Sequence, residues 1–478
     1  MMNTFKKHII ALVLGTVAIP LSAQTLEGAY FMDGAFQRHY LNPALMPSRS
    51  YVAIPVLGNL NFGASSDLSY SDFIYPSDGD KLHTFLSDKV SAEDFSKRIN
   101  DRNAVNMNFD LSLVSFGFFK WNGFNTFDVK LHSTTAVALP GDLFRFLKEG
   151  SSGETSYYDF HDVEASNNTY VEVALGHSHR IGEKWTVGAK LKGLVGAASA
   201  SAHFDKLSLT MSEDVWHLQS HGVVDLSCAG VIVKNNEEGE VDGLDFDTDN
   251  LGVAGGGAGI DLGVTYTPVK NLVLSLAVTD LGFIQWNKNL RAITPEGEVV
   301  YDGFENIGSD DYIDENGEER NPFDDEVDRL GDELEALFTV KESDAPKKRT
   351  SWLSPRLSVG AEYQILNNKI SFGVLSTTRF YNNNIHTSFM GSVTLKPLTL
   401  IQVGLNGTVS NLSNSFGAIL VLGPLFVGAE VSAMRVTPEY IPLGNHLTAN
   451  VNFGLSIPLG KDPKLKKKKA EYTELPIQ

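Results

Sequence analysis

The stretch KWTVGAKLKGLV, residues 184–195, places apolar side chains and polar or small side chains at alternate positions. Successive side chains of a β-strand point to opposite faces. Trp185, Val187 and Leu191 therefore share one face, and Lys190 and Lys192 share the other. This two-residue period predicts a strand whose apolar face lies against lipid or a packed core.

The same alternation recurs from residue 59 to residue 458. It is clear in 169–180, 356–365, 401–406 and 447–457, where glycine and small polar residues occupy the second face. Repeated runs of about ten alternating residues are typical of membrane β-barrels. We therefore predict an all-β protein, a transmembrane antiparallel barrel of the outer membrane. A large periplasmic β-sandwich is the soluble alternative.

Composition does not distinguish a membrane barrel from a soluble β-sandwich, because the hydrophobic fraction of 42% and the mean hydropathy of −0.09 suit both classes. Beyond residue 24 no run reaches the roughly 18–20 apolar residues that a membrane helix requires. A closed barrel is the other structure that can span lipid.

The predicted links between strands alternate in length. Links at 120–123, 181–184, 267–271, 367–369, 396–398 and 423–424 are short, and those between them are longer. Barrels of this class have short periplasmic turns and long outer loops. Counting gives about 14 strands, or 16 if residues 203–228 form another spanning hairpin. We favour 14, because 215–225 alternates poorly. Short helices are expected in the long loops, at Ser91–Asp94 and at 324–340.

The two ends of the chain suggest its location. Residues 1–23 have the basic, apolar and small-residue regions of a signal peptide, with cleavage between Ala23 and Gln24. We expect an N-terminal hatch-like segment at 24–58, a barrel at 59–460 and a basic periplasmic tail at 461–478. The predicted location is the outer membrane of a Gram-negative cell.

Charge excludes one class of partner. The 39 basic and 58 acidic residues give a net charge of −19, so nucleic acid is not expected. Alternation places a set of charged residues of both signs on the lumen face, where they can pair or shape a polar path. The set is Asp110, Asp128, Lys130, Glu172, Lys190, Lys192, Arg356, Glu362 and Glu430.

No catalytic or metal-binding grouping emerges from the sequence. The acidic loop 290–328 lacks EF-hand ligands, since Tyr312 and Phe323 occupy the first and last positions of the frame. His177 and His179 share an outward face, and no acidic neighbour is evident. We therefore expect no enzyme activity, no metal and no cofactor.

Several segments resemble known families. Leu41-Asn42-Pro43-Ala44-Leu45 resembles the element that opens FadL-type transporters of hydrophobic compounds. The segments at 115–119, 139–144 and 186–194 resemble an uncharacterised family of Bacteroidetes outer-membrane proteins, a domain of unknown function. The FadL-type resemblance implies a barrel of fourteen strands that contains an N-terminal hatch, with Asn42, Pro43 and Ala44 within it, and a hydrophobic ligand. The chain departs from that type by continuing beyond its last strand.

Two functions follow from these observations. The first is a channel or transporter for small compounds, hydrophobic ones if the resemblance holds. The second is a structural or assembly barrel that anchors a surface or periplasmic protein partner, or a secretion system. For both functions we expect the barrel to be surrounded by outer-membrane lipid.

Overall fold

The computed structural model describes residues 27–461 except for these gaps: 77–81, 151–154, 238, 248, 250–251, 295–296, 302–311, 314–318, 321–328, 330–331, 333–336, 338, 344–347, 383, 399, 433, 437–441 and 445–446. The predicted signal peptide, its cleavage site at Ala23 and Gln24, and the tail beyond Lys461 lie outside these residues. No helix within the described part is long and apolar enough to cross a membrane.

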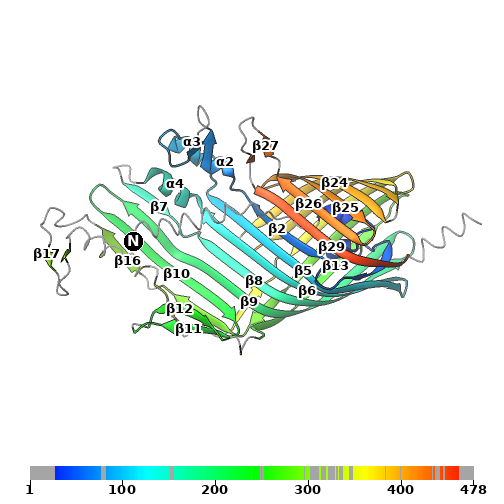
Figure 1. The fold of residues 1–478 in the computed structure, drawn as a ribbon, viewed down its shortest axis with the longest axis horizontal. Coiled ribbons are helices and arrows are strands. Elements are labelled where there is room, and N and C mark those ends of the chain that lie inside the picture. Colours follow the sequence, from blue (N-terminus) through cyan, green and yellow to red (C-terminus); the bar gives the residue numbers. More distant parts are fainter. Residues whose placement is uncertain are drawn as a thin grey trace, which may run out of the picture.

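Fourteen antiparallel strands form a closed barrel, which confirms the all-β prediction (Figure 1). The first strand has two pieces, β1 (Arg49–Ala53) and β2 (Leu60–Ser66), and each piece pairs with both β5 and β29, which closes the ring. The others, in order around the wall, are β5 (Arg102–Lys120), β6 (Gly123–Pro140), β8 (Glu164–Ile181), β9 (Trp185–Met211), β13 (Gly255–Tyr266), β14 (Leu272–Trp286), β21 (Arg356–Ile365), β22 (Ile370–Phe380), β23 (Ile385–Leu398), β24 (Ile401–Ser410), β25 (Asn414–Leu422), β26 (Leu425–Ser432) and β29 (Leu447–Lys461).

The wall extends beyond the barrel on one side. Strand β9 has 27 residues, and its first half pairs with β13 while its second half pairs with β10 (Trp216–Cys228). The hairpin over 203–228 therefore forms, but it lengthens the wall and adds no fifteenth or sixteenth spanning strand. Four short strands join this extension and a fifth continues the wall beside β14. They are β7 (Ser156–Asp159), β15 (Asn289–Ile293), β16 (Gly297–Tyr301), β19 (Lys341–Glu342) and β20 (Arg349–Trp352).

Short turns lie at one end of the barrel, as predicted. Backbone with positive φ makes several of them tight, at Trp121 and Asn122, at Gly182 and at Gly423. The other end carries the long loops, whose described residues form three helices and four two-stranded hairpins (Figure 1). These are α2 (Tyr70–Phe73), α3 (Ala92–Ser96), α4 (Gly141–Glu149), β3 (Ile74–Pro76) with β4 (Leu82–Thr84), β11 (Val231–Asn235) with β12 (Val241–Phe246), β17 (Tyr312–Ile313) with β18 (Glu319–Arg320), and β27 (Met434–Val436) with β28 (Pro442–Gly444).

The predicted capping box is confirmed. The Asp94 backbone N–H donates to the Ser91 hydroxyl at the start of α3, at 3.0 Å. The predicted helix over 324–340 falls largely outside the described residues, as does most of the acidic loop. Aromatic residues of the long loops, among them Phe73, Phe95 and Phe144, form a separate apolar cluster there together with Leu139 of strand β6.

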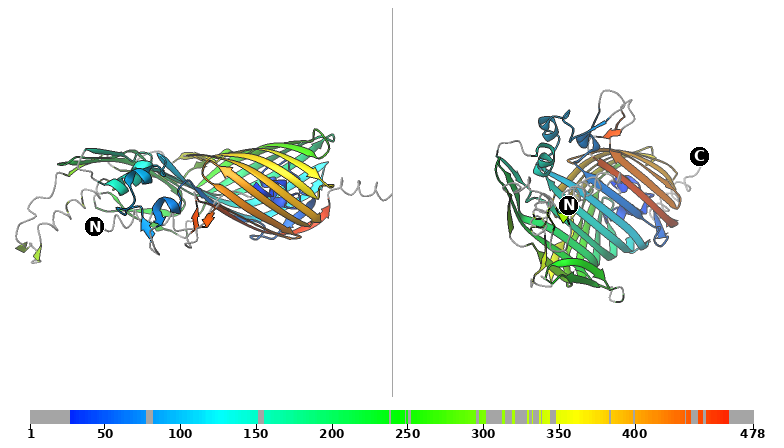
Figure 2. Two further views of the ribbon diagram at one scale, coloured as in Figure 1. Left: turned by 90° about the horizontal axis from the view of Figure 1, so that it is seen from above. Right: turned by 60° about the vertical axis from the view of Figure 1, so that its left-hand side comes forward.

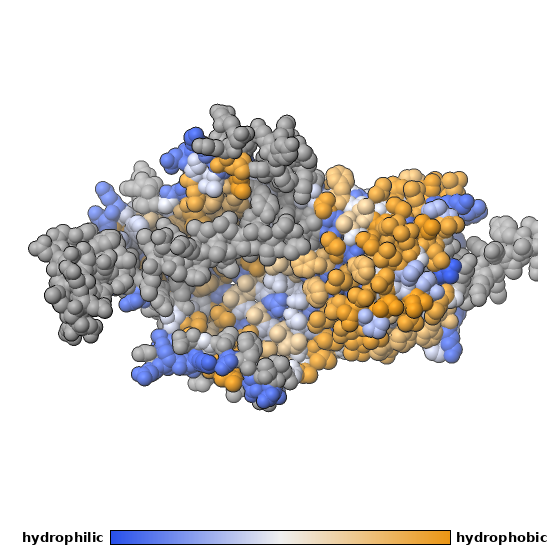
Figure 3. Space-filling model, viewed as in Figure 1, coloured by the Kyte–Doolittle hydropathy of each residue, from blue (hydrophilic) through white to orange (hydrophobic). Residues whose placement is uncertain are grey.

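The outer surface of the barrel carries an apolar band (Figure 3). Trp121, Trp185 and Tyr363 are exposed near the short turns, and Phe283, Trp352, Phe380, Phe389 and Phe416 are exposed toward the opposite end. On β9 the exposed apolar residues run from Trp185 to Val195. Ten residues of strand tilted by about 40° rise about 25 Å along the barrel axis, which is the height of a typical membrane band.

Candidate functional site

The N-terminal segment lies inside the barrel (Figure 2). Two short 3-10 helices, η1 (Glu27–Phe31) and η2 (Phe36–Tyr40), lead into the turn at Asn42-Pro43-Ala44. We call residues 27–48 the plug. Strand β1, which lies ahead of the expected boundary between residues 58 and 59, pairs with the wall strands β5 and β29. Pro55 and the positive φ of Val56 lie in the excursion that splits the first strand in two.

Glycines of the wall make room for the plug. A Cβ atom at Gly263 of β13 would lie 2.0 Å from Asn42 Oδ1, and one at Gly188 of β9 would lie 2.3 Å from the Pro43 carbonyl carbon. Gly188 and Gly263 are cross-strand partners. Gly373, Gly404 and Gly454 approach Phe31, Met32 and Gln37 in the same way. The small residues on the lumen face thus accommodate the plug, because larger side chains would overlap it.

Asn42 holds the turn in shape and ties it to the wall. The Ala44 backbone N–H donates to Asn42 Oδ1 at 2.9 Å, and Asn42 Nδ2 donates to the Tyr30 hydroxyl at 3.0 Å. That hydroxyl in turn donates to Ser275 of β14 at 3.0 Å. The predicted element therefore forms a compact turn whose polar groups are satisfied within the lumen.

The side of the plug that faces β22 to β26 is mainly apolar. It also makes polar contacts at Asp33, which accepts from Gln402 at 2.8 Å, and at Glu27, which accepts from Ser388 at 3.2 Å. The apolar residues on this side pack against wall residues of β22 to β26 in one buried cluster. From the plug come Ala29, Tyr30, Phe31, Met32, Ala35, Leu41 and Leu45, and from the wall Leu375, Met390, Ile419, Val421 and Phe426. This contact stabilises the plug by removing apolar surface from water.

The other side of the plug is polar. His39 Nε2 lies 3.2 Å from Asp128 of β6, and Lys190 of β9 lies 3.1 Å from the same carboxylate. The ring of Tyr40 lies under the ammonium groups of Lys130 and Lys190, at 4.1 and 4.9 Å from the ring centroid. The plug thus touches opposite walls with different chemistry.

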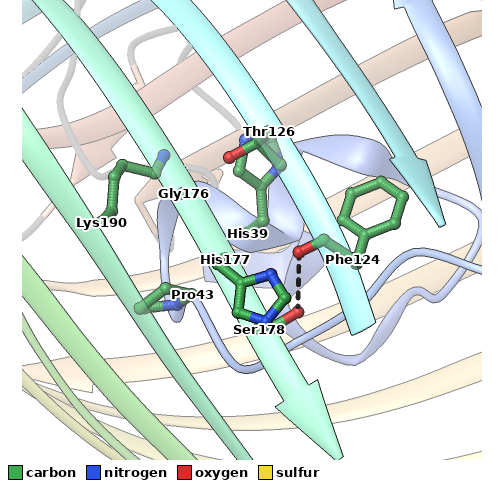
Figure 4. A pocket seen from close by; sticks show the side chains of 8 residues that line it. All are labelled: His39, Pro43, Phe124, Thr126, Gly176, His177, Ser178 and Lys190. Atoms are coloured by element: carbon green, nitrogen blue, oxygen red, sulfur yellow. Dashed lines mark hydrogen bonds between the residues drawn. The ribbon is translucent and has the colours of Figure 1, made fainter. Parts of the chain in front are cut away.

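A small recess lies between the plug and this polar wall (Figure 4). His39 and Pro43 line it from the plug. The wall contributes Phe124, Thr126, Gly176, His177, Ser178 and Lys190. His177 is exposed, and its Nε2 lies 3.4 Å from His179 Nδ1. In the described part of the chain, no three His, Cys, Asp or Glu residues group closely enough to hold a metal.

The nine predicted lumen charges all point inward. Eight are buried and Asp110 is partly exposed, near His132 at 2.6 Å. Glu172 lies 3.0 Å from Lys192 and 3.5 Å from Lys130. On strands β21 to β26 the predicted carboxylates lie in separate contacts. Glu362 pairs with Lys396 at 3.3 Å, and the Ser415 hydroxyl donates to Glu430 at 2.5 Å.

Two carboxylates of this network were not predicted from the sequence. Lys192 also binds Asp261 of β13 at 2.8 Å and Asp280 of β14 at 2.6 Å. Asp280 has a positive φ of 61° and lies in a bulge, where the register of β13 and β14 shifts. The apolar positions of β14 change phase at this point, from Leu276 and Val278 to Leu281 and Phe283. That change is the sequence signal for a bulge.

A turn crosses the mouth of the barrel at the end that carries the long loops. The side-chain amides of Asn384, between β22 and β23, and of Asn106 on β5 donate to each other at 2.9 and 3.0 Å. Asn108 Nδ2 donates to the Tyr381 hydroxyl at 3.0 Å. Strands β5 and β22 are seven positions apart in a ring of fourteen, so these bonds join opposite walls.

These features define a closed β-barrel protein whose lumen holds its own N-terminal segment. The chain belongs to a family of unknown function, DUF5723, whose family model matches residues 43–430. The resemblance to an uncharacterised family is thereby confirmed.

Other comparisons concern the fold. No curated protein matches the chain. The toluene transporter TodX of P. putida aligns over 94% of this chain and 99% of its own, at 10% identity and a TM-score of 0.39. A FadL homologue of Pseudomonas aeruginosa aligns over 91% of this chain and 98% of its own, at 11% identity and a TM-score of 0.37. The β domain of the Bordetella autotransporter BrkA aligns over 86% of this chain and 100% of its own, at 7% identity and a TM-score of 0.25.

Proposed function

We propose that the protein is an outer-membrane channel for small molecules, and that the plug controls passage through its lumen. The observation that carries the proposal is the position of the plug inside a closed barrel, in contact with walls on both sides. The apolar band on the outer face suits a lipid environment. The signal peptide at 1–23 would deliver the chain to that membrane.

A plug that touches one wall through apolar contacts and another through charges can detach from either wall separately. The contact through Asp128 is polar and adjoins the recess at Lys190, so water reaching it would weaken the ion pair. The contact at β22 to β26 is mainly apolar, so packed side chains hold the plug there as well as polar bonds. We therefore propose that the plug opens on the side of β6 and β9 and stays anchored on the other.

The proposal is tested by locking the plug to its anchored wall. A Cβ atom at Gly373 would lie 2.7 Å from Phe31 Cγ, one bond from Phe31 Cβ. Cysteines at both positions would thus place their Cβ atoms within about 4 Å, the range a disulfide needs. A second lock, between Asn42 and Gly263, joins the plug to the opposite wall at β13. A Cβ atom at Gly263 would lie 3.0 Å from Asn42 Cγ, one bond from Asn42 Cβ, and replacing Asn42 removes the amide that this Cβ atom would overlap. Both variants carry Cys228→Ser, because Cys228 is a free thiol.

Conductance is recorded in planar bilayers before and after reduction. We expect the lock at Asn42 and Gly263 to abolish openings and reduction to restore them. The lock at Phe31 and Gly373 should leave openings intact. A cross-strand pair at Val393 and Leu405, on the outer face, controls for the disulfide itself. If neither lock alters conductance, the plug does not control passage and the structural or anchoring function gains support.

A further inference from the structure

Three basic side chains lie in one row on the lumen face near the mouth at the end that carries the long loops. Arg356 of β21 is the cross-strand partner of Arg379 of β22, which is the partner of His386 of β23. Cross-strand partners project from the same face of a sheet, with Cβ atoms about 4.5–5.5 Å apart. Arg356 and His386 are 6% and 7% exposed. Two guanidinium groups and an imidazole therefore meet in the lumen.

Arg356 is buried and Arg379 is half-buried, and within the described part of the chain both guanidinium groups lack close polar partners. Among the described residues, neither donates a hydrogen bond and neither has a carboxylate within ion-pair distance; Arg379 Nε is buried without any partner. Asp280 on the neighbouring strand is held by Lys192 at 2.6 Å. Burying a charge without a close partner is unfavourable, so such groups mark a place where a partner of opposite charge binds.

Unpaired hydroxyl groups surround the same row. Thr279 is the cross-strand partner of Arg356 on β14, and Thr377 lies one step from Arg379 on the same face of β22. The hydroxyl oxygens of both threonines are buried and have no hydrogen-bond partner among the described residues. Hydroxyl and guanidinium groups can all donate hydrogen bonds. The row thus offers donors from three neighbouring strands.

The row lies between the plug and the turn that crosses the mouth. Below it, the Ser388 hydroxyl, one step from His386 on β23, donates to Glu27 of the plug at 3.2 Å. Above it, the Arg379 guanidinium lies 5.2 Å from the ring centroid of Tyr381, whose hydroxyl accepts from Asn108 on the opposite wall. A solute that entered from outside would pass the crossing turn, meet this row and then reach the plug.

We propose that Arg356 and Arg379, with His386, Thr279 and Thr377, form a binding site for an anionic solute that carries a carboxylate or phosphate group. Paired guanidinium groups bind such groups through bidentate hydrogen bonds. The inference rests on the proposed channel function for its biological sense, because it assigns a charge to the solute. Binding itself can be measured without transport.

The first test is calorimetric. Sodium decanoate, sodium acetate and sodium phosphate are titrated into the full-length protein in an uncharged detergent. The wild type should bind at least one probe, and the double variant R356Q/R379Q should lose at least tenfold in affinity. Arg291→Gln, which removes an arginine bound to Asp225 on the wall extension, is the matched control and should bind as the wild type does.

The pattern among the probes separates the possible sources of the anion. Binding of decanoate alone assigns an amphipathic carboxylate, and binding of acetate or phosphate as well assigns a free small anion. Failure of all three probes to bind, or binding that R356Q/R379Q leaves unchanged, would overturn the proposal. Neither result bears on the disulfide locks, which test the plug separately.

Thermal unfolding of Arg356→Met distinguishes a ligand site from a structural ion pair. Methionine removes the charge and keeps an unbranched chain in the same place. If the arginines await a ligand, the melting temperature in the absence of anion should stay or rise, and the stabilisation that the bound anion gives the wild type should vanish. A lower melting temperature with undiminished stabilisation by the anion would show that the row is structural.

Discussion

Gly188 and Gly263 face each other across β9 and β13, and the turn at Asn42 and Pro43 lies directly on this pair. Two glycines opposite each other are unusual in a strand interior, because glycine weakens a strand and leaves nothing to pack. Here the missing side chains leave the space that the turn occupies. The position of the plug therefore depends on which residues the wall carries at this pair.

A leucine at Gly188 should therefore displace the plug. Its side chain would overlap Pro43 and Ala44, and overpacking of this kind costs about 1–3 kcal/mol. We expect a folded barrel with raised conductance in planar bilayers and faster proteolysis within residues 27–48. Gly193→Leu on the same strand is the control, because a Cβ atom there meets only the Val173 carbonyl oxygen, at 3.8 Å. Equal conductance in the two variants would contradict this prediction.

Deleting Gln24 to Met46 removes most of the plug and leaves the wall complete from β1 onward. The barrel hydrogen bonds do not involve the deleted residues, so we expect folding to survive and conductance to exceed that of the intact protein. The apolar wall residues around Leu375 and Ile419 would then face water, which should lower the melting temperature. Unchanged conductance of a folded deletion variant would place control of passage elsewhere.

The sequence predicted the wall well because its signal is repeated. Alternation places Trp185 and Leu191 outward and Lys190 and Lys192 inward, and the structure has them so. Turn lengths then gave the strand number. Both signals are local, since a strand's faces and a turn's length depend on adjacent residues.

The site could be predicted only in part, because it is formed by contacts between residues far apart in the sequence or by local irregularities of a strand. Asp280 faces the lumen only because a bulge shifts the register of β14. The bonds between Asn106 and Asn384 join residues that are 278 positions apart, on opposite walls. The break in the first strand hides β1 from the ten-residue pattern, so the pairing of β1 with the wall could not be read from the sequence. The contact between Asn106 and Asn384 exists only because the ring of strands closes.

The orientation of the barrel can be tested with single cysteines in a Cys228→Ser background. Glu213 lies in the turn between β9 and β10 at the end of the wall extension, and Glu183 lies in the short turn between β8 and β9; both are exposed. If the long loops are outside, a membrane-impermeant maleimide should label Glu213→Cys on intact cells and label Glu183→Cys only after lysis. The reverse pattern would mean that the short turns face outward.

Acid should loosen the wall extension. Burial raises the pKa of Asp225 on β10, but hydrogen bonds from Arg291 and Asn289 outweigh this effect and lower the pKa below its usual value. A carboxyl with a lowered folded pKa adds stability above its unfolded pKa of about 3.9, and that stability disappears as the pH falls through the lower folded value.

The reporter for this loss is Cys228, which is partly buried at the end of the same strand. Its reaction with a dithiodipyridine, which modifies thiols in acid, should accelerate as the pH falls below about 4. In Asp225→Asn the carboxyl is absent, so the acid-dependent acceleration should shrink. An acceleration of equal size in both proteins would assign the effect to other groups.

Lys192 holds the centre of the lumen network. Its ammonium group lies within 3.0 Å of carboxylate oxygens of Glu172, Asp261 and Asp280, and its side chain is 3% exposed. Lys192→Met would leave three buried carboxylates close together without this cation, and breaking a buried ion pair typically costs about 3–5 kcal/mol. We expect a marked fall in the unfolding midpoint of the purified barrel in urea. Lys97→Met, which breaks an exposed pair with Glu93, should cost less than about 1 kcal/mol and serves as the control. Equal midpoints for the two variants would show that the network does not stabilise the barrel.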